Sequence, residues 1–261
     1  MTAVSSVPSS RWRHWQPWAI TPLLRMLTIR FAVPADAEPH TTCERCARPL
    51  DARSVAAGPL GRCACGARYG PAPLLLEAVT LGCAAVLVFT PGLSGWERAA
   101  YGWWSVCAVV LAFTDLAVHR LPRSLAFGSV AGLLVLLTPA AISGGHPADL
   151  GRAAAAGLLV AGLLALGALL PSTGLGGGDV TVGLSVGAAA GWISWFAVVT
   201  AMFAGWCLVA VSGVALIIAR RATRSTALPL GPALLAGTLL AVVLLRGGAA
   251  VALWHALAGI G

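Results

Sequence analysis

The sequence predicts an all-α fold: a polytopic membrane helical bundle of about seven transmembrane helices, with a small N-terminal cytoplasmic cysteine-rich region. Three observations support this class. Of 261 residues, 58% are hydrophobic and only 10% are charged, whereas a soluble domain carries about 25% charged residues. The composition changes near residue 73 from a polar, arginine-rich segment to an almost continuously apolar one. Arginines also gather in alternate loops between the apolar stretches.

The first part of the chain, residues 1–42, contains a mildly apolar run at 18–33 that is broken by Arg25 and Arg30. An arginine near the membrane centre costs about 2.5–3.5 kcal/mol. We therefore expect a cytoplasmic, interfacial segment here rather than a spanning helix, with a degenerate first span as the alternative. No cleavable signal peptide is expected, because no uninterrupted apolar core precedes a small-residue cleavage site.

The last part, residues 74–261, is predicted to be the transmembrane domain. A membrane-spanning helix needs about 20 apolar residues. The apolar stretches that approach this length lie at 74–92, 99–118, 124–142, 152–170, 179–192, 194–219 and 229–245. The tail at 247–260 is expected to form a short surface helix.

The arginines orient these helices. Nine of the 17 basic residues, all of them arginine, precede residue 73, and five more lie in the loops at 119–123 and 220–227. Positive residues collect on the cytoplasmic side of membrane helices. We therefore expect a multi-pass protein of the cell inner (plasma) membrane, with its N-terminal region in the cytoplasm. The residues expected to form an aromatic belt at the outer interface are Trp96, Trp103, Trp104, Trp192 and Trp195.

The net charge of +8 points to membrane lipid rather than nucleic acid. No stripe of alternating basic and aromatic residues, of the kind that stacks bases, is present. Arginines that flank apolar helices on the cytoplasmic side commonly face anionic lipid headgroups. Membrane lipid is therefore an expected partner, and nucleic acid is not.

The middle part, residues 43–73, holds two cysteine pairs, Cys43-x-x-Cys46 and Cys63-x-Cys65. Disulfides are rare in a cytoplasmic compartment, and four thiolates suit a tetrahedral zinc ion. We expect these four cysteines to hold a structural zinc, because few apolar residues surround them to fold the segment otherwise. Free thiols in a vestigial loop are the alternative.

Two aspartates are the candidate catalytic residues. Of nine acidic residues, we expect only Glu77, Asp115 and Asp179 to lie in or at the edge of a span, where an acidic group usually has a function. The predicted topology brings Asp115 and Asp179 to the same, cytoplasmic face. Two neighbouring carboxyl groups can share one proton. The ionised one can then activate water while the protonated one polarises a carbonyl.

Structural roles for the same residues stay open. Asp179 follows a glycine run and fits the N-cap of a helix. Asp115 has two candidate ion-pair partners, Arg120 and Arg123. Either aspartate also fits a proton relay in a transporter.

Four motifs resemble those of type IV prepilin peptidases, in the order that family has them. Asp115 is followed seven residues later by Pro122, as in the family's first aspartate motif, and 176–179 matches its GxGD motif, which presenilin-type proteases share. Residues 229–232 resemble the PxGP start of a late helix. The segment 63–71, followed by Glu77, resembles the family's cysteine knuckle and its approach to the membrane.

The resemblance covers roughly residues 43–245 and implies an aspartic-type endopeptidase with Asp115 and Asp179 as its catalytic pair. The implied substrates are prepilins or pseudopilins of type IV pili and protein secretion systems, cut at the cytoplasmic face. The chain departs from the family at Thr181, often Lys, and at Arg123, often acidic or Asn. Many members also methylate the product with S-adenosylmethionine. We do not assign that activity, because residues 1–42 lack the family's N-terminal motif.

Two other functions compete with a peptidase. One is a transport or non-enzymatic membrane protein with Asp115 and Asp179 in an ion path, although transporters usually place such residues near the midplane. The other is a family-like protein that binds pilin precursors without cutting them.

Overall fold

The computed structural model describes residues 20–31, 42–43, 45–49, 63, 65–67, 70–72, 74–119, 121–170, 175–221, 223, 226 and 228–247. Within these residues the fold is all-helical, with no β-strand. The helices are α1 (Ile20–Phe31), α3 (Leu75–Phe89), α4 (Gly95–Val118), α5 (Arg123–Gly144), α6 (Pro147–Ala168), α7 (Gly177–Ile193), α8 (Trp195–Ile218) and α9 (Leu230–Arg246).

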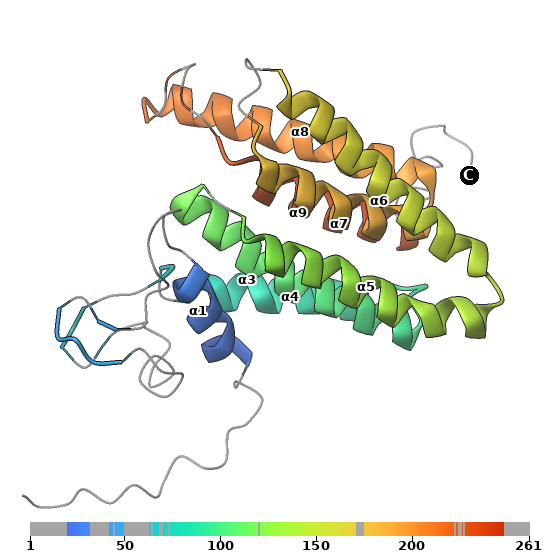
Figure 1. The fold of residues 1–261 in the computed structure, drawn as a ribbon, viewed down its shortest axis with the longest axis horizontal. Coiled ribbons are helices and arrows are strands. Elements are labelled where there is room, and N and C mark those ends of the chain that lie inside the picture. Colours follow the sequence, from blue (N-terminus) through green and yellow to red (C-terminus); the bar gives the residue numbers. More distant parts are fainter. Residues whose placement is uncertain are drawn as a thin grey trace, which may run out of the picture.

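The long helices run back and forth along one axis, and consecutive helices lie side by side (Figure 1). The tightest pair is α6 with α7. A Cβ atom at Gly157 would lie 2.8 Å from the carbonyl oxygen of Leu184, and one at Gly187 would lie 2.5 Å from that of Ala156. Glycine is therefore required at both positions, and the close approach of backbones is typical of membrane helix pairs.

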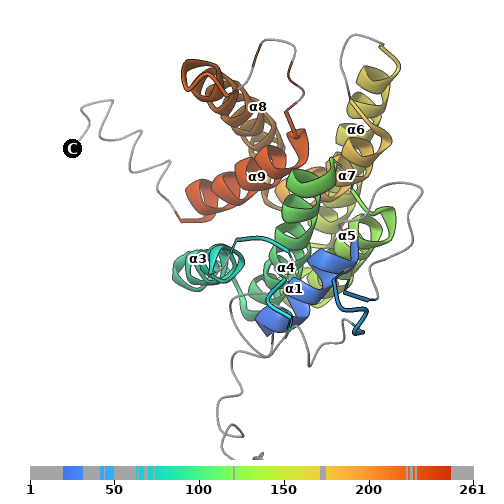
Figure 2. The ribbon, with the colours of Figure 1, turned by 90° about the vertical axis from the view of Figure 1, so that its left-hand side faces the viewer.

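The alternation of helices gives the bundle two distinct ends. At one end α4 and α6 finish and α5, α7 and α9 begin; Figure 2 looks onto this side of the molecule. Because Asp115 and Asp179 lie there, we call it the aspartate end. The opposite end, where α4 and α8 begin and α7 and α9 finish, we call the far end.

Four of the described helices, α4, α5, α6 and α8, are long and apolar enough to cross a membrane. The prediction of a membrane protein agrees with this finding. Each of the seven predicted spans coincides with a helix, but α3, α7 and α9 have only 15, 17 and 17 residues and are not among these four. The predicted number of about seven spans is therefore not confirmed. The expected tail helix at 247–260 falls almost wholly outside the described residues.

Helix α1 accounts for the apolar run that we expected at the interface. Its 12 residues extend about 18 Å, too short for a hydrocarbon core of about 30 Å. Leu24 and Arg25 are each 1% exposed, and Leu24 belongs to one buried apolar cluster with Val109 and Val110 of α4. The Arg25 guanidinium donates to both carboxylate oxygens of Glu77, at 2.8 and 2.9 Å. This ion pair explains how an arginine can be buried in the helix contact.

The expected tryptophan belt is wrong for two of its five residues. Trp104 and Trp192 are 1% and 4% exposed and belong to the core between the helices. Trp96, Trp103 and Trp195 are exposed on the bundle surface. Hydropathy and spacing place a tryptophan near a helix end, but the neighbouring helices decide whether it faces lipid or the interior.

Candidate functional site

Asp115 lies in the last turn of α4. The helix ends at His119, whose φ of 50° is left-handed, and the chain then turns through Leu121 into α5. The Asp115 residue is only 6% exposed, and its Oδ2 atom has no hydrogen-bond partner among the described residues. A buried carboxyl oxygen without a partner is costly, so such an atom is a candidate for binding something other than the protein itself.

Asp179 lies in the first turn of α7. Gly176 is the N-cap residue, and Asp179 accepts a hydrogen bond from its backbone N–H at 2.9 Å. Asp179 is therefore not the N-cap that its sequence position allowed; it closes the first turn from the third helical position. The bond uses one carboxylate oxygen, Oδ2.

Leu121 brings the three predicted motifs together. A Cβ atom built on Gly178 would lie 2.9 Å from the Leu121 Cβ, and one on Gly231 would lie 3.4 Å from the Leu121 Cδ1. The same Cβ on Gly231 would lie 2.8 Å from Asp115 Oδ2. The end of α4 and the starts of α7 and α9 therefore meet at one place, and only glycine leaves room there for the Asp115 carboxyl group.

The charges around this site are mixed. The carboxylate of Asp179 lies within electrostatic range of Asp115, as does His119. The Arg123 Nη2 atom would lie 3.3 Å from a Cβ on Gly177, at the start of α7. Arg123 forms no ion pair with Asp115 within the described part of the chain, and Arg120 falls outside it. Two carboxyl groups that repel each other in a partly desolvated site favour a state in which they share one proton.

No protein-family model, curated relative or solved structure matches this chain. The chemistry of the site must therefore be judged from its own residues. A pair of carboxyl groups at the end of a helical bundle, one of them with an unsatisfied oxygen, has the donors and acceptors for water activation.

The four predicted cysteine ligands come together in a separate cluster. Their Sγ atoms all lie within 4.8 Å of one another, with Cys43 to Cys65 and Cys46 to Cys63 each 3.6 Å apart. Zinc–sulfur bonds of about 2.3 Å in a tetrahedron place sulfurs about 3.8 Å apart. The cluster therefore has dimensions that can hold a metal ion such as zinc.

Tight turns present these thiols. The Ala47 N–H donates to the Cys43 carbonyl oxygen at 2.7 Å, and the Gly66 N–H donates to that of Cys63 at 2.9 Å. Ala47 and Gly66 both have positive φ, 55° and 84°. The second turn thus accommodates the shorter Cys-x-Cys spacing by placing glycine, which tolerates this conformation, directly after Cys65.

Crowding of the thiols affects their ionisation. A hydrogen bond from the Arg48 backbone lowers the pKa of Cys46, but hydrogen bonds with Cys43 and the other thiols, together with burial, raise it to about 12 overall. Four thiolates at this spacing repel one another, so a cation has to replace their protons. The donor set suits a soft or borderline divalent metal.

Sequence reasoning missed two residues that organise the bundle. Leu121 lies between Asp115 and Pro122, and a leucine in so apolar a sequence gives no signal of its position between helices. The expectation that only Glu77, Asp115 and Asp179 lie in or at a span is wrong, because Glu97 and Asp149 lie in the first turns of α4 and α6, which are both candidate spans. Of these two, Glu97 is buried, with 6% of its surface exposed. The Ser94-x-x-Glu97 spacing is a capping-box signature and could have located the helix start.

Proposed function

We propose that this chain is a membrane-embedded aspartic endopeptidase that removes the leader peptide of prepilins or pseudopilins at the cytoplasmic membrane face. The observation that carries the proposal is the meeting of Asp115, Gly178 and Gly231 around Leu121, with Asp179 directly after Gly178. These residues come from three segments that are far apart in the sequence, and each belongs to a motif that resembles the prepilin peptidases.

The two aspartates receive different roles from their surroundings. Burial disfavours the ionised form of Asp179, and the hydrogen bond from the Gly176 N–H offsets part of that cost, so we assign Asp179 as the base that takes a proton from water. Asp115, buried and with an unpartnered Oδ2, is assigned as the protonated acid that donates to the scissile carbonyl oxygen. Asp179 takes a proton from water as the water oxygen bonds to the carbonyl carbon. When the C–N bond breaks, Asp179 gives this proton to the leaving amine, and Asp115 recovers its proton from the hydroxyl of the intermediate as the carbonyl reforms.

The placement of the site suits a substrate that is half in the membrane. Asp115 and Asp179 lie at one end of the apolar bundle, so water can reach them while an apolar segment of the substrate remains in lipid. A leader peptide with basic residues precedes the hydrophobic helix of a prepilin, and its cleavage point would lie at this level. We further propose that zinc is the metal of Cys43, Cys46, Cys63 and Cys65 and that its role is structural.

Cleavage of a prepilin by the purified protein in lipid tests the function. We expect the wild type to release the leader, with both products identified by mass spectrometry. Asp115→Asn and Asp179→Asn should each lower the rate by at least about 1,000-fold, because neither half of the acid–base pair works alone. Asp149→Asn, which alters an acidic residue at the far end, is the matched control and should cleave normally. Cleavage that persists in either site variant would refute the dyad.

A further inference from the structure

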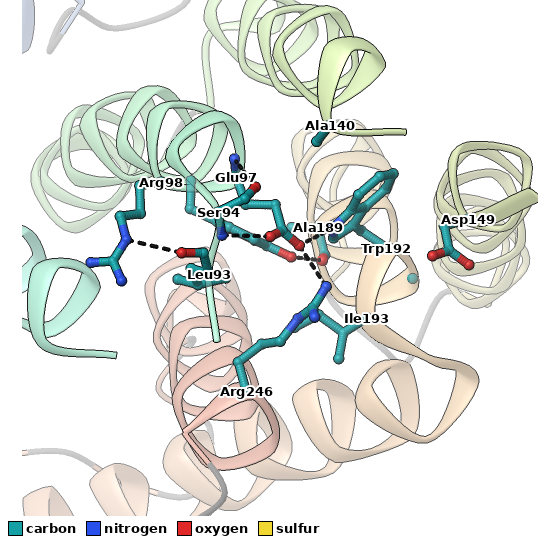
Figure 3. Close-up of polar contacts among 12 residues, drawn as sticks. Leu93, Ser94, Glu97, Arg98, Ala140, Asp149, Ala189, Trp192, Ile193 and Arg246 are labelled. Carbon is teal, nitrogen blue, oxygen red and sulfur yellow. Dashed lines mark hydrogen bonds and ion pairs between the residues drawn. The ribbon is translucent and has the colours of Figure 1, made fainter. Parts of the chain in front are cut away.

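Glu97 is the centre of a buried polar network at the far end of the bundle (Figure 3). Its Oε1 atom accepts hydrogen bonds from the Trp192 indole N–H at 2.7 Å and from the Arg246 guanidinium at 2.5 Å. Its Oε2 atom accepts one from the Ser94 backbone N–H at 2.8 Å. A carboxylate with three donors is well compensated for burial.

These donors come from the helices that build the aspartate site. Glu97 belongs to α4, Trp192 to α7 and Arg246 to α9. The opposite ends of the same three helices carry Asp115, Asp179 and Gly231. A second bond, from the Tyr101 hydroxyl of α4 to the Ala189 carbonyl oxygen of α7 at 2.8 Å, reinforces the α4–α7 connection one turn deeper.

We propose that Glu97 is a positioning residue for the aspartate site, acting through the three helices that it holds together at their far ends. The inference rests on the proposed peptidase function for its catalytic readout, but the geometry it predicts can be measured without a substrate. Glu97 does not touch the reacting groups. It sets how far apart Asp115 and Asp179 are held.

The geometry of the helices gives the size of the effect. Glu97 and Asp115 are 18 residues apart on α4, or about 27 Å at about 1.5 Å per residue. A tilt of about 5° at the far end therefore moves the Asp115 end by about 2 Å. A displacement of about 1 Å in a catalytic group can cost about 100-fold in rate, so a modest loosening of the Glu97 network should be visible in catalysis.

Arg152 of α6 provides a matched control at the same end. Its guanidinium donates to the carbonyl oxygens of Gly191 and Trp192, at 2.7 and 2.6 Å, and pairs with Asp149 at 2.7 Å. It therefore ties α6 to the end of α7 through several polar contacts. It does not join α4 to α7 or α9, and none of the candidate site residues lies on α6.

The kinetic test compares Glu97→Ala, Glu97→Gln and Arg152→Gln with the wild type on a prepilin substrate. We expect Glu97→Ala to lower kcat by about 100-fold and to leave KM within about twofold, because the substrate contacts are intact. Glu97→Gln keeps an acceptor for Trp192 and should lose less, and it carries the test if Glu97→Ala does not fold. Arg152→Gln should keep the wild-type kcat while lowering the melting temperature.

The structural test measures the distance between nitroxide labels at Leu116→Cys and Gly176→Cys, next to the two aspartates. The labelled chain has Cys83, Cys107 and Cys207 replaced by alanine and its other four cysteines loaded with zinc. Glu97→Ala should lengthen or broaden this distance by about 2 Å, and Arg152→Gln should leave it unchanged.

The outcomes separate the two proposals. An unchanged label distance in Glu97→Ala, or an equal loss of kcat in Arg152→Gln, would overturn the positioning role. A changed distance in a protein that never cleaves prepilin would support the positioning role and refute the peptidase function.

Discussion

The two ends of the bundle differ in how their buried acidic groups are hydrogen-bonded. At the far end, Glu97 accepts hydrogen bonds from an indole, a guanidinium and a backbone amide. At the aspartate end, Asp115 is equally buried, but its Oδ2 atom has no partner among the described residues. A fully bonded carboxylate stabilises the helix arrangement. An unsatisfied one lowers stability and has to be explained by what it does.

Two glycines of α9, Gly231 and Gly237, also differ in what surrounds them. Gly237 of α9 faces backbone: a Cβ there would lie 2.5 Å from the Gly205 nitrogen and 2.6 Å from the Ala201 carbonyl oxygen. Gly231, near the start of the same helix, faces the Asp115 carboxyl oxygen. One glycine allows two helices to approach, and the other leaves space for a functional group. The comparison thus separates a glycine that allows helix packing from a glycine that leaves space beside the proposed catalytic Asp115.

The largest expected difference is between a variant that loses activity, Asp115→Asn, and a variant that loses stability, Glu97→Ala. Asp115→Asn should abolish cleavage, by at least about 1,000-fold, and change the melting temperature little, because the Asp115 Oδ2 atom has no hydrogen-bond partner among the described residues to lose. Glu97→Ala should cost about 2–3 kcal/mol, because it leaves the buried Trp192 N–H without an acceptor and the partly exposed Arg246 guanidinium without its counter-charge. Thermal unfolding of both variants in the same detergent measures this. A loss of stability in Asp115→Asn as large as that in Glu97→Ala would break the comparison.

The next largest effects are expected from Gly231→Ala and Gly237→Ala. Gly231→Ala should lower cleavage by about 100-fold, because the added methyl displaces the Asp115 carboxyl group, with little change in melting temperature. Gly237→Ala should instead lower stability by about 1–3 kcal/mol through overpacking against backbone. Rates and melting temperatures measured side by side check both statements. Equal behaviour of the two variants would remove the distinction between the regions.

The cysteine cluster is predicted to be separable from the bundle. Its Sγ atoms hold no contact with the aspartate site in the described residues, so Cys43→Ser should lower zinc content from about one ion per chain to a small fraction of that. The helical signal and the melting temperature of the bundle should remain close to wild type. Elemental analysis measures the zinc content, and circular dichroism measures the helical signal and the melting temperature. Cys207→Ser, at an exposed position on α8, is the control and should retain the metal.

The sequence predicts the helices well because hydropathy is a local property. Each predicted apolar stretch coincides with a helix, and the candidate ligands Cys43 and Cys65 do come together. The order of the helices also allows Asp115 and Asp179 to be placed at one end, since each helix reverses the chain direction. These predictions need only the local hydropathy and the alternating direction of successive helices.

Long-range polar pairing could not be predicted in the same way. Glu97 and Arg246 are 149 positions apart, and each is an ordinary charged residue beside an apolar stretch. In the sequence, Arg25 argues against a membrane helix, because its partner Glu77 cannot be identified there. The cost of burying a charge depends on its partner, and the partner is set by how the helices pack.

The Arg25–Glu77 pair distinguishes structural from functional burial at the aspartate end. Removing only one member, as in Arg25→Met, leaves the Glu77 carboxylate buried without its cation and should cost about 3–5 kcal/mol. The double variant Arg25→Met with Glu77→Leu removes both charges and fills similar space, so its stability should lie within about 1 kcal/mol of the wild type. Melting temperatures of the single and double variants give the coupling between the two residues. A double variant as unstable as Arg25→Met would mean that the Arg25 hydrogen bond to the Pro71 carbonyl oxygen, at 3.1 Å, holds α1 in place more strongly than the ion pair does.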